Sequence, residues 1–91
     1  MTKFQEKCIK QCKELLAGVV GNVDFVKGGL SEEYYVGHFS YQGCNYIIHI
    51  YEDEAGFGES NKSGPISERW SNRTDEEVIS EFLLALGKKI A

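Results

Sequence analysis

The segment from Glu32 to Glu54, EEYYVGHFSYQGCNYIIHIYEDE, restricts the fold of this chain more than any other. Two runs rich in aromatic and β-branched residues flank Gln42-Gly43, and glycine readily adopts the positive φ angle that a two-residue hairpin turn needs. The segment therefore predicts one long β-hairpin in which Tyr41 faces Cys44. A slip of one residue in this register would move every side chain to the opposite face of the sheet.

In this register, one face of the hairpin carries side chains that are apolar or small. Its facing pairs are Tyr41 and Cys44, Phe39 and Tyr46, Gly37 and Ile48, and Tyr35 and Ile50. Such a face is typical of the side of an antiparallel sheet that packs on the core. Because Gly37 has no side chain, it also predicts that a helix approaches the sheet closely at this point.

The other face of the hairpin is mixed, with two tyrosines, two histidines and two aliphatic residues. Its facing pairs are Ser40 and Asn45, His38 and Ile47, Val36 and His49, and Tyr34 and Tyr51. Beyond them, Glu33 faces Glu52. One step further, Glu32 faces Asp53. Like charges that face each other directly are destabilising, so this end predicts either a frayed, solvated end or a site for a cation or a basic partner.

Length and composition restrict the class of protein. A chain of 91 residues is expected to form a single domain, residues 1–91, with a core of modest size. The three cysteines are an odd number and no secretory signal is recognisable, so we expect a reducing, cytoplasmic location. No apolar run approaches the ~20 residues that a membrane-spanning helix requires, so we expect no membrane partner.

The distribution of charge argues against nucleic acid as a partner. The net charge is −4, and residues 32–87 hold eleven acidic side chains against only Lys62, Arg69 and Arg73, a local balance of −8. Nucleic-acid affinity that is independent of sequence comes mainly from lysine and arginine at the phosphates. The acidic body of this protein is therefore expected to repel nucleic acids.

Two amphipathic helices are predicted near the ends of the chain. The first runs from Thr2 to Ala17, and Thr2 with Gln5 matches a capping box. Its expected buried stripe comprises Phe4, Cys8, Cys12, Leu15, Leu16 and Val19. The second helix begins at Thr74, which forms a capping box with Glu77. Its expected stripe comprises Val78, Ile79, Phe82, Leu83, Leu86 and Ile90, and Leu84 lies off it.

Cys8 and Cys12 stand four residues apart on the apolar stripe of the first helix. A structural zinc site closes with a full set of cysteine and histidine ligands, and only Cys44, His38 and His49 remain to complete one. We therefore interpret the two helical thiols as small buried hydrophobic groups, and we expect no metal site.

The remaining segments are less clearly patterned. Residues 22–27 are expected to form a short first strand. The stretch from Gly56 to Arg73 has no helical period and is too long for an ordinary connection. We expect a fourth strand near Ile66–Trp70, with Trp70 anchored in the core because large aromatic side chains dominate core burial.

The string Gly56–Ser63, GFGESNKS, nearly matches the phosphate-binding loop G-x-x-x-x-G-K-S, with Asn61 in place of the second glycine. That loop works only when a helix opens directly after its lysine. Here Gly64-Pro65 follows and breaks any helix. We therefore predict that this segment binds neither ATP nor GTP.

The order of the predicted elements favours an α+β fold of two layers. An antiparallel sheet of three to four strands would carry the N- and C-terminal helices on one face, over Phe39, Tyr46 and Ile48. The order α-β-β-β-α resembles the double-stranded-RNA-binding domain. That family reads RNA partly through a basic cluster at the start of its last helix, where this chain has Asp75-Glu76-Glu77. The resemblance is therefore one of topology.

The mixed face of the hairpin is the surface best suited to bind a partner. Interfaces favour tyrosine, and an acidic rim steers a basic partner. We expect a small acidic protein-binding module, in the class of an inhibitor, phage or immunity protein directed at a basic, nucleic-acid-processing protein. A homodimer that covers this face is an equally open interpretation. The expected contact residues are Tyr34, Val36, Ile47, Tyr51, Glu32, Asp53, Glu54 and Glu59.

An alternative hypothesis is a small enzyme or ligand-binding protein. His38 and His49 would be diagonal neighbours on the mixed face, within mutual reach, and could act as an acid–base pair. No nucleophile with a base and an orienting group emerges beside them, so we expect no enzymatic activity and no cofactor. A third hypothesis, Ca²⁺ or Mg²⁺ bound by the acidic end, is disfavoured because the chain lacks a D-x-D-x-D-G loop.

Overall fold

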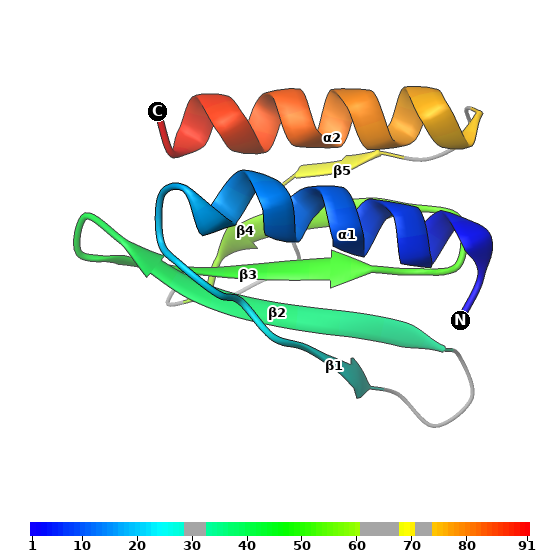
Figure 1. Ribbon diagram of the computed structural model, residues 1–91, viewed down its shortest axis with the longest axis horizontal. Coiled ribbons are helices and arrows are strands. Elements are labelled where there is room, and N and C mark those ends of the chain that lie inside the picture. Colours follow the sequence, from blue (N-terminus) through cyan, green and yellow to red (C-terminus); the bar gives the residue numbers. More distant parts are fainter. Residues whose placement is uncertain (29–32, 61–67, 71–73) are drawn as a thin grey trace.

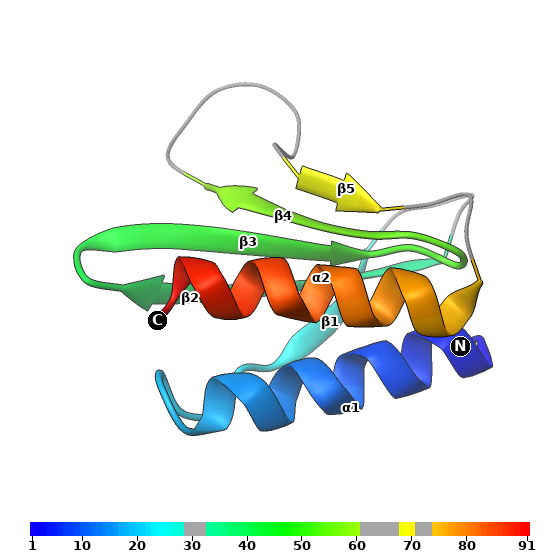
Figure 2. The ribbon, with the colours of Figure 1, turned by 90° about the horizontal axis from the view of Figure 1, so that it is seen from above.

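The computed structural model describes residues 1–28, 33–60, 68–70 and 74–91. Within these residues, two helices and five strands form two layers, with both helices on the same side of one antiparallel sheet (Figures 1 and 2). The α+β class and the two-layer arrangement predicted from the sequence are confirmed. The elements in chain order are α1 (Lys3–Ala17), β1 (Phe25–Gly28), β2 (Tyr34–Tyr41), β3 (Cys44–Ile50), β4 (Ala55–Glu59), β5 (Glu68–Trp70) and α2 (Asp75–Lys89).

The central hairpin of β2 and β3 forms in the predicted register. Its ladder runs from Tyr41 and Cys44 beside the turn to Tyr35 and Ile50 at the other end. Gln42 and Gly43 form the turn, with φ angles of 49° and 79°. Two successive positive φ angles match the twist of the flanking strands. The local sequence pattern therefore placed both the turn and the two faces correctly.

Strand β4 is an element that the sequence pattern does not reveal. It pairs with β3 through a turn at Glu52-Asp53, which a 2.8 Å hydrogen bond from the Tyr51 N–H to the Glu54 carbonyl closes. Its sequence, AGFGE, contains two glycines. Glycine is depleted in strands, so this sequence is typical of a loop. The sheet order is β1-β2-β3-β4-β5, one strand more than the three to four expected. The resemblance to the three-stranded RNA-binding topology therefore does not extend to the whole sheet.

Strands β1 and β5 form the two edges of the sheet (Figure 1). β1 occupies residues 25–28, slightly later in the chain than the predicted 22–27. β5 lies within the segment Ile66–Trp70 that was expected to contain a strand. Residues 66 and 67 of that segment lie outside the described part of the chain.

Another element does approach Gly37 closely, but this element is a strand and not the helix that was predicted. A Cβ atom built on Gly37 would come within 2.8 Å of the Phe25 ring, which extends from the neighbouring strand β1. The expectation of a close helix at this position is therefore wrong. The glycine instead leaves room for an aromatic ring from the adjacent edge strand.

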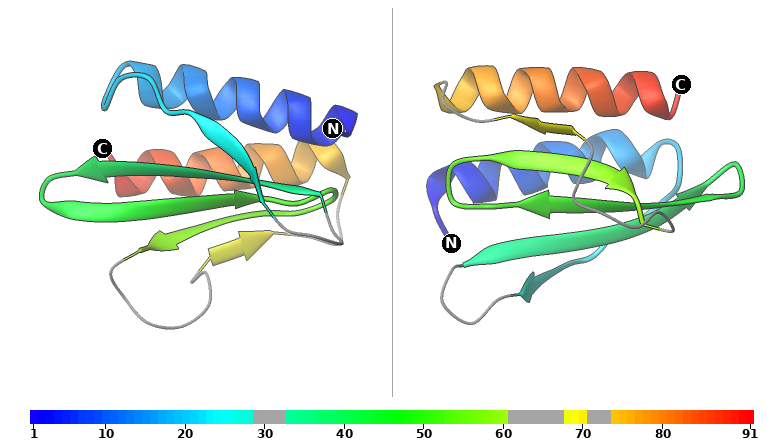
Figure 3. Two further views of the ribbon diagram at one scale, coloured as in Figure 1. Left: turned by 90° about the horizontal axis from the view of Figure 1, so that it is seen from below. Right: turned by 180° about the vertical axis from the view of Figure 1, so that it is seen from behind.

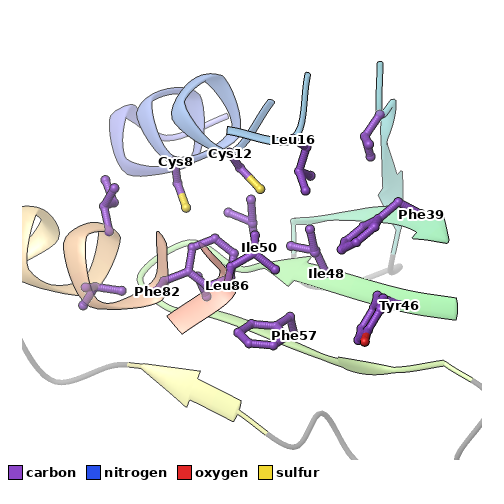
Figure 4. Packing of buried hydrophobic residues seen from close by; sticks show 14 of the residues in the cluster. Cys8, Cys12, Leu16, Phe39, Tyr46, Ile48, Ile50, Phe57, Phe82 and Leu86 are labelled. Carbon is purple, nitrogen blue, oxygen red and sulfur yellow. The ribbon is translucent and has the colours of Figure 1, made fainter. Parts of the chain in front are cut away.

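The core fills the space between the helices and the hairpin face that was predicted to be apolar (Figure 4). One residue of the buried stripe predicted for α1 is wrong. Val19 is 44% exposed, because α1 already ends at Ala17. Leu84 is exposed, as expected from its position off the α2 stripe. The buried hydrophobic residues are Phe4, Cys8, Cys12, Leu16, Val23, Phe39, Tyr46, Ile48, Ile50, Ala55, Phe57, Val78, Ile79, Phe82, Leu86 and Ile90.

The start of α1 is tied to the sheet by a buried glutamine. Thr2 and Gln5 form the predicted capping box, with reciprocal bonds of 3.1 Å and 2.8 Å. The Gln5 side chain is fully buried, and its Nε2 donates to the Glu33 carbonyl over 3.0 Å. Each polar atom of the Gln5 amide thus has a partner, which offsets the cost of burying it.

Cys8 and Cys12 are fully buried in the core, as the interpretation of them as hydrophobic groups predicted (Figure 4). Burial raises the pKa of the Cys8 thiol to about 12. Burial, and secondly the neighbouring Cys8, raise the pKa of Cys12 as well. Both thiols therefore stay protonated near neutral pH, and a protonated thiol is neither a nucleophile nor a metal ligand.

Candidate functional site

The face of the sheet opposite the helices is the candidate functional surface. Seen from behind, the strands lie in front of α1 and no helix crosses them (Figure 3). We define the open face as the outward positions on β1–β3 and the residue that follows β3. None of them is an aspartate, glutamate, lysine or arginine. The positions are Val26, Gly28, Tyr34, Val36, His38, Ser40, Asn45, Ile47, His49 and Tyr51.

Three rings gather at one end of the open face. The centroid of Tyr34 lies 5.4 Å from that of Tyr51 and 5.7 Å from that of His49, and His49 and Tyr51 are 5.7 Å apart. The Nδ1 atom of His49 is 2.9 Å from the Tyr51 hydroxyl oxygen, a hydrogen bond between the two side chains. We call Tyr34, His49 and Tyr51 the ring cluster. All three residues are half-buried.

Glycine and valine residues of β1 and β2 continue the surface beside the ring cluster. A Cβ atom on Gly28 would lie 2.9 Å from the Tyr34 ring, so this ring lies against the bare backbone of the edge strand. Val36 is half-buried, whereas Val26, its partner across the ladder, is 61% exposed. Val26 is a surface residue that sequence reasoning missed, although its alternation with Phe25 could have revealed it.

The four apolar or aromatic contact residues predicted from the sequence do share one face, but they are less exposed than expected. Tyr34, Val36, Ile47 and Tyr51 are each half-buried. The structure brings Tyr34 and Tyr51 together in the ring cluster. Ile47 lies nearer the middle of β3, where it pairs with His38 of β2. The sequence therefore predicted the residues of the surface, while the structure shows how they pack.

The acidic end of the hairpin differs from the prediction. β3 ends at Ile50, and the exposed residues Glu52 and Asp53 turn the chain into β4. The predicted facing of Glu33 and Glu52 is therefore wrong, because a short strand and a tight turn replace the extended hairpin end. Glu32 lies outside the described residues.

Glu33 is held by opposite charge rather than repelled by like charge. Its Oε1 atom lies 2.7 Å from the amino group of Met1 and 3.0 Å from the Tyr35 hydroxyl, which donates to it. The hydrogen bond from the amino group is the main cause that lowers the pKa of the Glu33 carboxyl, followed by the bond from Tyr35. Lys27 lowers the same pKa by a weaker coulombic effect.

The other predicted acidic contact residues separate in space. Glu54 is half-buried directly after the turn, close in sequence to Tyr51. Glu59 is half-buried at the far end of β4, where it pairs with Tyr46. The structure thus leaves the Glu52-Asp53 turn as the exposed acidic border nearest the ring cluster, and it places Glu59 at the opposite end of the strand.

The two histidines occupy the predicted register positions, but they have different surroundings. His38 is exposed and faces Ile47, whereas His49 is half-buried and its ring contacts Tyr34 and Tyr51. The hydrogen bond to Tyr51 orients the His49 ring. A general base must lie within hydrogen-bond reach of the proton that it removes, and the ring cluster occupies one ring nitrogen of His49.

Strand β4 limits the width of the surface. Gly56 and Gly58 pair with His49 and Ile47, so they lie on the same side of the sheet as the open face. Both glycines are nevertheless buried. Among the residues whose burial is described, the accessible part of this side of the sheet therefore lies on β1–β3. The same residues belong to the string Gly56–Ser63 that nearly matches a phosphate-binding loop, and its first four residues form a strand instead.

In the described part of the chain, no group of histidine, cysteine and acidic side chains is arranged to hold a metal ion, and no helix is long and apolar enough to cross a membrane. No protein-family model, no curated protein and no solved structure matches this chain. The function must therefore be inferred from the surface itself.

Proposed function

We propose that this chain is a small protein-binding module that docks a partner protein on its open face. The observation that carries the proposal is the absence of acidic and basic side chains from every position of that face. In the whole chain, 26% of the residues are charged. The centre of a protein interface is depleted of charged residues and enriched in tyrosine, and both features meet here.

The partner that this surface fits has a basic rim. The chain has a net charge of −4, and the exposed carboxylates of Glu52 and Asp53 border the ring cluster. Such a border accelerates the association of an oppositely charged protein and gives the rate its salt dependence. Nucleic-acid-processing proteins have basic surfaces, so an inhibitor or immunity protein directed at one of them is the class of function that we favour. Three free cysteines suit a reducing cytoplasm.

Binding assays with a matched pair of variants test this proposal. Tyr51→Ala removes a ring from the cluster, and Leu84→Ala removes an exposed hydrophobic side chain, 62% accessible, from the helical layer. Affinity capture from lysate, followed by titration of the purified captured protein, should show the Tyr51 variant bind at least about thirtyfold more weakly, as expected for a hot spot worth over ~2 kcal/mol. The Leu84 variant should bind like the wild type.

Sedimentation of the chain alone distinguishes the main competing interpretation. A monomer at micromolar concentration leaves the open face free for a different protein. A dimer that Tyr51→Ala dissociates would show that a second copy covers this face, and would contradict the proposal. Equal binding of the captured protein by both variants would place the interaction on another surface.

A further inference from the structure

We infer that the capping pair of α1, Thr2 and Gln5, positions the ring cluster from the opposite side of the sheet. This inference rests on the proposed function, and it adds two residues that shape the docking surface without being part of it. It follows from where the β2–β3 ladder ends and from the bonds that the two side chains make outside their own helix.

The two tyrosines of the ring cluster lie just beyond the paired part of the central hairpin. The β2–β3 ladder ends at Tyr35 and Ile50, so Tyr34 and Tyr51 stand one residue past its last pair. Their ring centroids are nevertheless 5.4 Å apart. Tyr34 pairs with Gly28 on its other side, but this pairing does not determine its distance from Tyr51. Contacts outside the β2–β3 ladder therefore help to set the spacing of the two rings.

Gln5 holds the first of these strand ends. Its Nε2 atom donates over 3.0 Å to the carbonyl of Glu33, the residue directly before Tyr34. The Gln5 side chain is fully buried, and a buried amide that loses its partner is costly. The bond therefore restricts the main chain from which the Tyr34 ring extends.

Thr2 contacts the second strand end. Its hydroxyl donates over 3.4 Å to the carbonyl of Glu52, the residue directly after Tyr51. The same hydroxyl accepts from the Gln5 N–H, and the Gln5 Oε1 accepts from the Thr2 N–H. Each side chain therefore has one bond inside the capping box and one to a strand end. Figure 1 shows α1 starting at the end of the sheet where β2 begins and β3 ends, so the pair spans both strands.

The bonds to the strands distinguish this pair from an ordinary capping box. Glutamate serves as well as glutamine at the third helical position, and aspartate serves as well as threonine at the N-cap, because each position needs only a hydrogen-bond acceptor. An ionised carboxylate cannot donate to a carbonyl. The Gln5 amide and the Thr2 hydroxyl are therefore required for the contacts to the strands and not for capping.

Variants that keep the cap and remove a donor test the inference. Gln5→Glu and Thr2→Asp each retain the acceptor of the capping box, and Thr2→Ser retains both bonds of the hydroxyl. NOEs between the Tyr34 and Tyr51 rings of the full chain should weaken most in Gln5→Glu. They should weaken less in Thr2→Asp, because the bond to Glu52 is longer, and stay unchanged in Thr2→Ser. The Cα chemical shifts of α1 should remain helical in all three variants.

Further variants separate positioning from general destabilisation. Cys12→Ala leaves a cavity in the core two turns along α1 and touches neither strand end, so it should leave the ring NOEs unchanged. If the buried carboxylate of Gln5→Glu prevents folding, Gln5→Met replaces it, because it is uncharged and of similar length. The protein captured by the open face should bind the Gln5 variant about three- to tenfold more weakly, the effect of one lost hydrogen bond. It should bind Thr2→Ser like the wild type.

The outcomes distinguish this inference from the proposed function. Ring NOEs that persist in both Gln5→Glu and Gln5→Met would overturn the inference, and so would an equal loss in Cys12→Ala. Ring NOEs lost in Gln5→Glu with unchanged affinity for the captured protein would support the positioning role and contradict the proposed function. Affinity lost in Tyr51→Ala with ring NOEs that Gln5→Glu does not alter would leave the proposed function standing and remove the positioning role.

Discussion

The two faces of the hairpin β2–β3 are built from alternate residues of the same strands, yet they have different physical roles. The inward face places Ile48 and Ile50 in the core with no accessible surface. The outward face carries the alternate residues Ile47 and His49, and both are half-buried. Neighbouring residues of one strand therefore have different surroundings, because successive side chains point to opposite faces.

The residue types on the two faces differ mainly in their polar members. The inward face carries four aromatic residues beside Ile48 and Ile50, and two of them, Phe39 and Tyr46, stack with centroids 5.2 Å apart. The outward face collects two tyrosines and two histidines, whose polar atoms remain compatible with water. Aliphatic residues and tyrosines occur on both faces, whereas the histidines, Ser40 and Asn45 lie on the outward face only.

The strongest test of this comparison uses two adjacent isoleucines. Ile48→Ala should lower the free energy of unfolding by about 2–5 kcal/mol, because it leaves a cavity in a fully buried site. Ile47→Ala removes the same atoms from the open face and should cost less than ~1 kcal/mol. Urea denaturation followed by circular dichroism measures both. Equal losses would show that the open face is packed as tightly as the core.

A smaller effect is expected where the inward face meets the edge strand. Gly37→Ala would bring a methyl group within 2.8 Å of the Phe25 ring, and the displacement of this ring should cost about 1–2 kcal/mol. Gly87→Ala is the control, because nothing lies within 4 Å of its position in α2; there alanine should stabilise the helix by about 1 kcal/mol. In a Phe25→Ala background the cost of Gly37→Ala should largely disappear, and a cost that persists would assign it to another contact.

The smallest expected effect concerns pH at the end of the hairpin. The folded-state pKa of Glu33 lies below its ordinary value of 4.5. Its carboxylate therefore contributes stability that is present above that value and is lost as the pH falls through the lower, folded-state pKa. Glu33→Gln should remove this part of the acid dependence of unfolding, whereas Glu14→Gln should not. Identical acid profiles for the wild type and Glu33→Gln would show that the ion pair with Met1 does not affect stability.

Much of the fold was predictable because short-range patterns specify it. The glycine turn determined the register of β2 and β3, and threonine caps with apolar stripes located both helices. Strand β4 was not predictable, because its two glycines carry no alternation and its pairing with β3 depends on contacts made only in the folded chain. The role of Gly37 was misjudged for a related reason, since its neighbour Phe25 comes from a different strand.

The candidate surface shows the same limit. The sequence by itself determined which residues of the hairpin share a face, because alternation in a strand is a local property. Only the tertiary structure decided that Tyr34, His49 and Tyr51 form one cluster, that Glu33 pairs with the amino group of Met1, and that Glu52 and Asp53 form the turn into β4. These outcomes depend on where strands end and which elements become neighbours, and that is determined by the packing of the whole chain.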